Sequence, residues 1–378
     1  MIYLDNAAGT FPKPERVMQA MQEAARRYGA NPGRGSYALS RDTSAMVERV
    51  RGQLAELLHA PDPQRIVFTA GATASLNTAV FGLLRPGDEV VTTAMEHHAL
   101  WRPLEELARA GRIRLQTVAA DAFGYIEAEQ VERRIGPRTR LLAIGHASNV
   151  CGSVQPLDDL LEIAARRQTP LLLDAAQSAG LLPLDVRHPG LALVALPAHK
   201  ALYGPPGVGA LYVREDIRLQ PLLFGGTGVF SEAVGMTRQM PQRLEAGSLN
   251  TVGIAGWGAA LQFVQEIGLP RLYRHALRLT QRLYRALVDC RGIRLYADPT
   301  RPRVPVLALT AAGIEPAELA AALDRHGVAV RSGYHCAYQA HLSLGTANGG
   351  ALRFSPGWFN REAEIDAAAA ALRQTLGL

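Results

Sequence analysis

The segment from Leu171 to Gly209 constrains the fold of this chain most strongly. It begins with a run of leucines that ends in Asp174, and a second apolar run, LALVAL, leads to His199 and Lys200. Continuous apolar runs of this kind are typical of parallel strands buried on both faces. The sequence therefore predicts two buried strands of one sheet, with a carboxylate at the end of the first and a lysine just beyond the second.

Asp174 and Lys200 together suggest a chemistry. A carboxylate at the end of a buried strand is costly to bury unless a cationic or proton-bearing partner meets it. Pyridoxal phosphate fits such a pair, because an aspartate keeps the pyridine nitrogen protonated and a lysine binds the aldehyde covalently. On these two residues alone, the alternative stays open that Asp174 caps a turn and Lys200 is a solvated loop lysine.

Composition limits the class of protein. The chain has 378 residues, enough for one large domain and a smaller one, and its 48% hydrophobic and 20% charged content is ordinary for a globular enzyme. No stretch has the length of a membrane span or the layout of a signal peptide. Three well-separated cysteines form neither a disulfide framework nor a zinc pattern, which favours a cytoplasmic protein without a metal site. The formal charge of +6 comes from dispersed basic residues, so we expect no nucleic-acid or membrane partner.

Strands and helices alternate along the chain up to about residue 257. A helix expected at about 41–59 precedes the strand IVFTA, a small-residue turn at 71–75 and an apolar helix, a geometry that presents backbone N–H groups to a phosphate. This alternation predicts a mainly parallel sheet with ligands at the carboxyl ends of its strands. Polar clusters follow four of the expected strands: Glu96-His97-His98, His146–Asn149, Asp174–Gln177 and His199-Lys200.

Beyond residue 257 the pattern changes to long helices rich in Ala, Leu and Arg, expected at about 272–288, 315–326 and 360–376. The short strands VPVLALT, VAVRS and ALRFS lie between them, which predicts a smaller α+β domain. We therefore expect an N-terminal arm (1–14) that packs with the small domain, a large domain (15–257) and a small C-terminal domain (258–378).

These motifs, in this order, resemble those of the fold-type I pyridoxal-phosphate enzymes. Within them the chain is most similar to the class V aminotransferase family and its cysteine desulfurases, in particular the group-II desulfurases and selenocysteine lyases. The resemblance implies a large domain with a mainly parallel seven-stranded sheet, a smaller α+β C-terminal domain and a homodimer. It is carried by YLDNAAGTFPKP, EHHALWRP, SNVCG, LLLDAAQS, AHKALYGPPGVGALYV, EAGSLNT, RSGYHCA and ALRFSPGWFN.

The resemblance implies roles for the matched residues. Lys200 would bind the cofactor and remove the α-proton of the substrate. Arg353, with Arg331 nearby, would bind the substrate carboxylate through its planar guanidinium. Asp174 would contact the pyridinium nitrogen of the cofactor, and Gln177 would contact its phenolic oxygen. His97 (rather than His98) would stack on the ring and assist proton transfer, and Asn149 would lie near the ring and the substrate carboxylate. The phosphate would be bound by Ala72, Thr73, His199 and a second subunit's Ser248.

Cys336, in RSGYHCA, distinguishes a desulfurase from other family members. A thiolate there would attack the sulfur of bound L-cysteine, leave a persulfide on the enzyme and release L-alanine. Arg331 and His335 nearby would favour the thiolate. A sulfur-acceptor protein would then take the sulfur toward iron–sulfur clusters, thiolated tRNA or a cofactor. Cys151 and Cys290 are expected to be structural.

Other functions remain open from the sequence. Selenocysteine lyase, β-elimination or epimerisation of another small amino acid would use the same cofactor. A cysteine hydrolase would use Cys336 with His335, but adjacent residues on a strand point to opposite faces, and Lys200 and Asp174 would lack a role. A non-catalytic sulfur carrier is the third possibility.

Two segments depart from the family's pattern. Many relatives carry two threonines where this chain has Gly71-Ala72-Thr73, and a proline is common where it has Ala337-Tyr338-Gln339.

Overall fold

The structure, a computed structural model, describes residues 1–33, 35–229 and 234–378. Its central sheet consists of β2 (Ile66–Thr69), β3 (Asp88–Thr93), β4 (Ile113–Val118), β5 (Thr139–Gly145), β6 (Leu171–Asp174), β7 (Leu191–Pro197) and β8 (Gly209–Val213). The strand order is β2-β8-β7-β6-β5-β3-β4. Only β8 runs antiparallel to its neighbours in this sheet, and the other neighbouring pairs are parallel. The prediction of a mainly parallel, seven-stranded sheet is confirmed.

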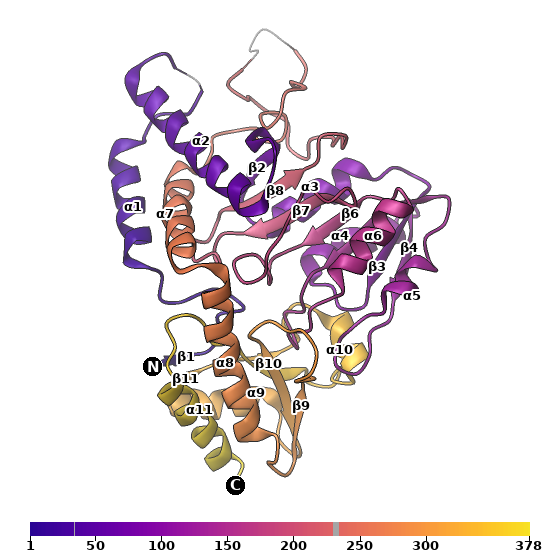
Figure 1. Cartoon of the computed structure of the whole chain (residues 1–378), viewed down its shortest axis with the longest axis vertical. Helices are drawn as coiled ribbons and strands as arrows, with labels where there is room; N and C mark the ends of the chain where they lie inside the picture. The colour runs from indigo at the N-terminus through magenta and orange to yellow at the C-terminus, as the bar shows by residue number, and fades with distance from the viewer. Residues whose placement is uncertain (34, 230–233) are drawn as a thin grey trace.

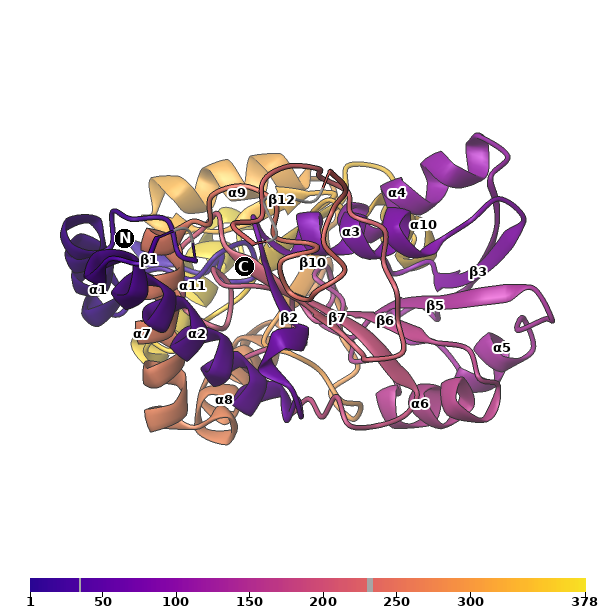
Figure 2. The ribbon, with the colours of Figure 1, turned by 90° about the horizontal axis from the view of Figure 1, so that it is seen from above.

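Side chains of this sheet alternate between two apolar cores, as a period of two residues requires. In β6, Leu171 and Leu173 pack into one core and Leu172 packs into the other. Figure 2 shows the corresponding helix layers on the two sides of the strands. The first core includes residues of α1 (Glu15–Arg27), α2 (Ala38–Leu58), α5 (Ala128–Glu132), α6 (Leu157–Arg166) and α7 (Thr251–Ile267), and the second includes α3 (Ala72–Leu83) and α4 (His98–Arg109). A short 3₁₀ helix, η1 (Pro63–Arg65), precedes β2.

The C-terminal part forms a smaller domain with its own core, in the lower half of Figure 1. Its antiparallel sheet has the order β12-β13-β10-β9. The elements are β9 (Ile293–Tyr296), β10 (Leu307–Ala311), β12 (Arg331–Gly333), β13 (Ala351–Phe354), α8 (Leu269–Leu287), α9 (Pro316–Arg325), α10 (Tyr338–Leu344) and α11 (Glu362–Thr375).

The N-terminal arm pairs with the small domain. Strand β1 (Ile2–Tyr3) lies parallel to β11 (Val328–Ala329), and the N-terminus therefore lies beside the C-terminal part in Figure 1. The segment VAVRS, expected as one strand, is divided at Val330 into β11 and β12. The division has a physical reason, because β11 pairs with the arm whereas β12 pairs with β13.

Helices α7 and α8 connect the two parts of the molecule. The proposed domain boundary after residue 257 falls inside α7, whose buried residues belong to the core of the large sheet. In α8, Leu279, Leu283 and Leu287 belong to the core of the small domain. The change of core lies within α8, because Leu272 still belongs to the core of the large sheet. Gly268, with a φ of 83°, turns the chain between the two helices.

No helix in the described ranges is long and apolar enough to cross a membrane. The same residues contain no group of three or more His, Cys, Asp or Glu side chains arranged to hold a metal ion.

Candidate active site

A pocket of about 620 Å³ opens at the carboxyl ends of β6 and β7, where the chain leaves the sheet through Asp174 and Pro197. It brings together all the predicted site residues except Ser248: Ala72, Thr73, His97, Asn149, Asp174, Gln177, His199, Lys200, Arg331, Cys336 and Arg353. Ser248 is exposed and lines two other pockets of the same chain. The small domain contributes Arg331, Cys336 and Arg353, so the pocket lies between the two domains.

One end of the pocket is suited to a phosphate. Helix α3 begins there after Gly71, and no side chain caps its N-terminus. The N–H groups of Ala72 and Thr73 have no hydrogen-bond partner in the described part of the chain. His199 also lines the pocket, and its buried Nδ1 is unpaired. Free backbone donors at a helix N-terminus attract anions, and His199 adds a further ring nitrogen.

Glycine is required in the turn before α3. Gly71 has a φ of 142°, a conformation that L side chains rarely adopt. The neighbouring strand β8 also approaches this turn closely, since a Cβ on Gly209 would lie 2.6 Å from the Gly71 Cα. The small residues Gly71 and Ala72 thus let backbone N–H groups approach this end of the pocket, where Thr73 is the residue with a hydroxyl side chain.

Asp174 lies buried on the pocket floor. Its Oδ1 accepts a hydrogen bond from the Ala176 N–H at 2.9 Å. Burial raises the pKa of the carboxyl group, although the charge of Lys200 opposes the shift. A cationic N–H donor beside this carboxyl group would oppose the shift and favour its ionised form. A protonated pyridine nitrogen is such a donor.

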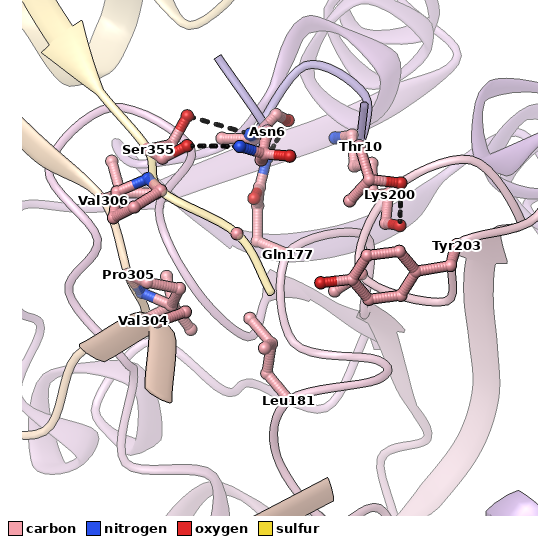
Figure 3. A pocket seen from close by; sticks show the side chains of 15 residues that line it. Asn6, Thr10, Gln177, Leu181, Lys200, Tyr203, Val304, Pro305, Val306 and Ser355 are labelled. Carbon is pink, nitrogen blue, oxygen red and sulfur yellow. Dashed lines mark hydrogen bonds between the residues drawn. The ribbon is translucent and has the colours of Figure 1, made fainter. Parts of the chain in front are cut away.

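Lys200 lines the same pocket as Asp174. Desolvation lowers its pKa to about 8, with the charge of Asp174 opposing this and those of Arg353 and Arg331 adding to it. About one tenth of its amine is therefore neutral at pH 7, far more than for an ordinary lysine, and a nucleophile or general base requires this neutral form. A second cavity beside Lys200 is lined by Asn6, Gln177 and Tyr203 among others (Figure 3). At about 30 Å³ it is too small for an amino acid.

The structure places His97, and not His98, in the pocket lining. His97 Nδ1 accepts a hydrogen bond from the Ala99 N–H at 3.0 Å, so Nε2 carries the ring proton. Burial, and then the charge of Lys200, lowers the pKa of His97 to about 3. A neutral imidazole can stack on an aromatic ring and donate from Nε2, but it carries no positive charge at neutral pH.

Arg353 is oriented by a residue that the sequence reasoning missed. Its Nη2 donates to Asp5 Oδ1 at 2.5 Å, and its Nη1 donates to the Asn149 carbonyl at 2.8 Å. Its buried Nε has no partner. Arg331 is the direct neighbour of Arg353 across β12 and β13, so both guanidinium groups reach the pocket from the same pair of strands. These two cations, with N–H groups to spare, suit a carboxylate ligand.

Asn149 and Gln177 are both engaged by the protein. Asn149 Nδ2 donates to the His335 carbonyl at 2.5 Å. Gln177 Nε2 donates to the Ala7 carbonyl at 2.9 Å, which leaves one amide N–H for a ligand. Asn149 therefore joins the wall of the pocket to the loop that carries Cys336.

Cys336 is exposed and lines the pocket. It is not on a strand: His335 and Cys336 form a turn with φ values of 49° and 56°. We expected His335 to favour the thiolate, but burial lowers the pKa of His335 to about 3, so its ring adds no positive charge near the thiol at neutral pH. Its ring is buried and stacks on His341 at 5.7 Å, whereas Cys336 faces solvent. Arg331 remains as a nearby positive group.

The other two cysteines are outside the pocket lining. Cys151 is buried, and its thiol donates to the Phe123 carbonyl at 3.3 Å. Cys290 is half-buried at the end of α8, with its thiol 3.6 Å from the Ala286 carbonyl. Both contacts fit the structural roles that we expected for these residues.

Glu96 is a second residue that the sequence reasoning did not assign. It is buried, and its oxygens accept hydrogen bonds from Thr93 Oγ1 at 2.6 Å and the Gly145 N–H at 2.8 Å. Desolvation, with a smaller contribution from Asp174, raises its pKa to about 8. Gly145 pairs with Asp174 across β5 and β6, so an uncharged Glu96 lies next to the strand that ends in Asp174.

We expect Glu96→Gln to flatten the pH dependence of stability. With a folded pKa of about 8 and an ordinary value of 4.5, the folded state holds a proton that the unfolded state lacks between these pH values. The free energy of unfolding should therefore fall as pH rises through this window, by up to about 1.4 kcal/mol per pH unit. Gln is uncharged and keeps the shape of the side chain. Urea unfolding at pH 5, 6.5 and 8 should show the variant gaining stability relative to the wild type; parallel curves would contradict the assignment.

The residues of this pocket fit pyridoxal phosphate: an anion site of free N–H groups, a buried carboxyl group that needs a cationic partner, and a lysine with a lowered pKa. The comparisons with known proteins agree with this fit. The sequence matches the family described as Aminotransferase class-V over residues 2–368. A protein of Methanothermobacter thermautotrophicus named probable cysteine desulfurase is 35% identical, with 100% of this chain and 95% of that protein covered.

Two solved structures are also similar over most of their length. The apo cysteine desulfurase of Thermococcus onnurineus has a TM-score of 0.93 and 31% identity, covering 100% of this chain and 95% of its own. The cysteine desulfurase CsdA of Escherichia coli, in an S-sulfonic acid form, has a TM-score of 0.90 and 30% identity, covering 99% and 94%.

Proposed function

Because this chain belongs to the class V aminotransferase family, whose fold and pyridoxal-phosphate chemistry it shares, we propose that it is a cysteine desulfurase that converts L-cysteine to L-alanine and carries the sulfur as a persulfide on Cys336. The observation that carries the proposal is the position of the Cys336 thiol, which is exposed in the wall of the pocket that also holds Lys200. An ordinary transaminase or an epimerase does not need a thiol there.

The residues that line the pocket would hold the cofactor. Ala72 and Thr73 would donate backbone N–H groups to the phosphate, and His199 would add a ring nitrogen. Asp174 would pair with the ring nitrogen and stay ionised in that pair. His97 would stack on the ring, Gln177 would donate its remaining amide N–H to the ring oxygen, and Lys200 would bind the aldehyde. Bound pyridoxal phosphate supplies a ring that withdraws electrons from the carbon next to the substrate's amine.

The protein's own groups then orient the substrate and move its protons. Arg353 and Arg331 hold the carboxylate, and Asp5 keeps the Arg353 guanidinium in place. Lys200, as a neutral amine, accepts the α-proton. The Cys336 thiolate attacks the substrate sulfur: the S–S bond of the persulfide forms while the C–S bond of the substrate breaks. The electron pair of the C–S bond stays with the carbon fragment, which is protonated and released as alanine.

The hydrolase alternative does not fit the Cys336 turn. A cysteine hydrolase needs an imidazole close enough to the thiol to take its proton. The His335 ring is buried, stacks on His341, and approaches the Arg331 carbonyl with Nε2 at 3.3 Å. The other ring nitrogen, Nδ1, has no hydrogen-bond partner in the described part of the chain, so the ring is not paired with the Cys336 thiol.

Product analysis tests the proposed reaction directly. Purified, cofactor-loaded protein is given L-cysteine or L-selenocysteine, and alanine is measured together with sulfide or selenide. Alanine from cysteine, with persulfide on the protein, is the expected result. Release of alanine from selenocysteine alone would identify a selenocysteine lyase, and no alanine from either substrate would contradict both reactions.

A homodimer is part of the proposal. Ser248 is exposed and does not line the candidate active site of its own chain, which fits a contact with a partner's phosphate site. Leu222 lines the pocket, and Leu223 and Phe224 beside it are 68% and 75% exposed. Apolar side chains that continue from a pocket onto the surface fit burial against a second subunit.

We expect the protein to sediment at twice the mass of one chain. We also expect Ser248→Asp to weaken the binding of pyridoxal phosphate by at least about tenfold, because the added negative charge would face the partner's phosphate. Ser248→Ala is the matched control, since it removes the hydroxyl without adding charge. Equilibrium dialysis of the cofactor measures the effect. A fully active, cofactor-loaded monomer would contradict the dimer.

The sulfur leaves the enzyme through an acceptor protein in the cytoplasm, in iron–sulfur cluster assembly or another pathway that uses persulfide sulfur. The exposure of Cys336 supports transfer to a partner, because a persulfide there can be reached from outside the pocket. All cysteines of the chain are free thiols, as is usual in a reducing compartment.

A further inference from the structure

We propose that the backbone N–H of His98, the first residue of helix α4, holds the Cys336 loop in position for attack on the substrate sulfur. This role deepens the proposed desulfurase function and rests on it. The peptide unit between His97 and His98 would then connect the residue that faces the cofactor ring to the residue that positions the nucleophile. His98 acts here as a positioning residue through its backbone, and its side chain is not required.

The first hydrogen-bond donors of α4 account for this contact. The N-terminal N–H groups of a helix have no partner inside the helix. In α4, Ala99 donates to the His97 side chain at 3.0 Å, and Leu100 donates to the His97 carbonyl at 2.9 Å. The His98 N–H instead donates to the Cys336 carbonyl at 2.6 Å. The small domain therefore supplies the partner that this helix end lacks.

The loop needs such a contact because of its conformation. His335 and Cys336 are consecutive non-glycine residues in the left-handed region, at φ 49° and 56°. This conformation is unfavourable for residues with a Cβ and persists only where surrounding contacts hold it. The carbonyl groups of both residues are bound by the large domain, that of His335 by Asn149 Nδ2 at 2.5 Å and that of Cys336 by the His98 N–H.

These two hydrogen bonds set the position of the Cys336 thiol relative to the substrate, in addition to stabilising the loop. The loop between β12 and α10 is exposed at Cys336, and the thiol must reach a substrate that Lys200 and Arg353 hold from other elements. The Asn149 carbonyl accepts from Arg353 Nη1 at 2.8 Å, so the contacts that fix the loop are continuous with the carboxylate site. A small displacement of the loop would thus affect sulfur attack more than proton removal by Lys200.

The substitution His98→Pro removes this donor without disturbing the helix. Proline is favoured at the first helical position, where its missing N–H is not needed by the helix. A residue before proline prefers extended backbone, and His97 already has φ −64° and ψ 149°. The His97 side chain keeps its hydrogen bond from Ala99. The matched reference is His98→Ala, which keeps the N–H and loses only the imidazole, whose Nε2 is 3.4 Å from the Tyr338 N–H.

The experiment compares the two holoenzyme variants with cysteine. We measure exchange of the substrate α-proton in D₂O, which reports on Lys200, and the rate of persulfide formation on Cys336 in a single turnover. We expect α-proton exchange within about twofold of His98→Ala and persulfide formation slower by at least tenfold. Equal persulfide rates in the two variants would overturn the proposal. An equal loss of both rates would also overturn it, since the defect would then lie at the cofactor.

A measurement that does not depend on activity or on the folding of a variant completes the test. In the wild-type holoenzyme the His98 amide should be protected from hydrogen exchange, whereas a first-turn amide without a partner exchanges freely. Exchange of this amide at the unprotected rate would contradict the hydrogen bond from the His98 N–H to the Cys336 carbonyl. If the His98 amide is protected and the enzyme releases no alanine from cysteine, this hydrogen bond stands as a structural contact and the proposed desulfurase function fails.

Discussion

Replacing Lys200 with alanine is expected to abolish both alanine release and covalent retention of pyridoxal phosphate after borohydride reduction. Lys200 lines the pocket beside Asp174, and desolvation lowers its pKa to about 8. Its amine serves the site twice, as the group that binds the aldehyde and as the base that accepts the α-proton. Loss of a general base alone costs about 10²–10⁴ in rate, so we expect a fall of at least about 10³-fold when the attachment is lost as well.

Lys13 provides the matched control for this experiment. Desolvation lowers its pKa to about 8 as well, and it lies near the site, where its Nζ donates to the His199 carbonyl at 2.8 Å. It does not line the pocket. Lys13→Ala should therefore keep a reducible covalent cofactor, seen as an added mass on the protein after borohydride. If Lys200→Ala still gained that mass, the assignment of the cofactor lysine would be wrong and Lys13 would be the next candidate.

The fold was largely predictable because its signals are local and periodic. The leucines of β6 alternate between two cores, as a strand buried on both faces requires. Ligand-binding residues follow the carboxyl ends of parallel strands, so Asp174 and Lys200 meet although the residues between them fold elsewhere. The order of the motifs then indicated the family, and with it the expected cofactor.

Contacts between distant segments could not be read from the sequence. Asp5 and Arg353 are 348 positions apart, and the arm reaches the end of β13 through the pairing of β1 with β11 and the bridge between Asp5 and Ser355. Nothing in VAVRS marks the division at Val330, which depends on two different partner strands. The burial of Glu96 and of the His335 ring, which sets their pKa values, likewise follows from packing and not from residue type.

The Cys336 loop shows the same limit at the centre of the site. Its left-handed residues are a histidine and a cysteine, so no glycine in the sequence marks the turn. The hydrogen bond from His98 connects residues 98 and 336 through the backbone, and a backbone donor leaves no trace in the choice of side chain. A loop was expected here from the motif, but its turn geometry and the burial of the adjacent His335 ring were not.

Replacing Cys336 with alanine is expected to separate the sulfur-transfer step from the rest of the site. The side chain is exposed at the pocket wall, and its loop is held through backbone carbonyl groups that alanine retains. The variant should therefore bind pyridoxal phosphate and cysteine as the wild type does. Attack on the substrate sulfur requires a thiolate, so persulfide formation should be absent and alanine release from cysteine should fall by about 10²-fold or more.

The control and the second substrate make the result specific. Cys290→Ala removes a half-buried thiol at the far end of α8 and should leave alanine release unchanged. Selenocysteine turnover by Cys336→Ala should persist, because a selenolate is a better leaving group than a thiolate and can depart without attack by the enzyme. Equal alanine release from cysteine by the wild type and Cys336→Ala would exclude the persulfide mechanism. The cofactor assignment would stand even then, because it depends on Lys200 and Asp174, whose positions in the pocket do not involve the Cys336 thiol.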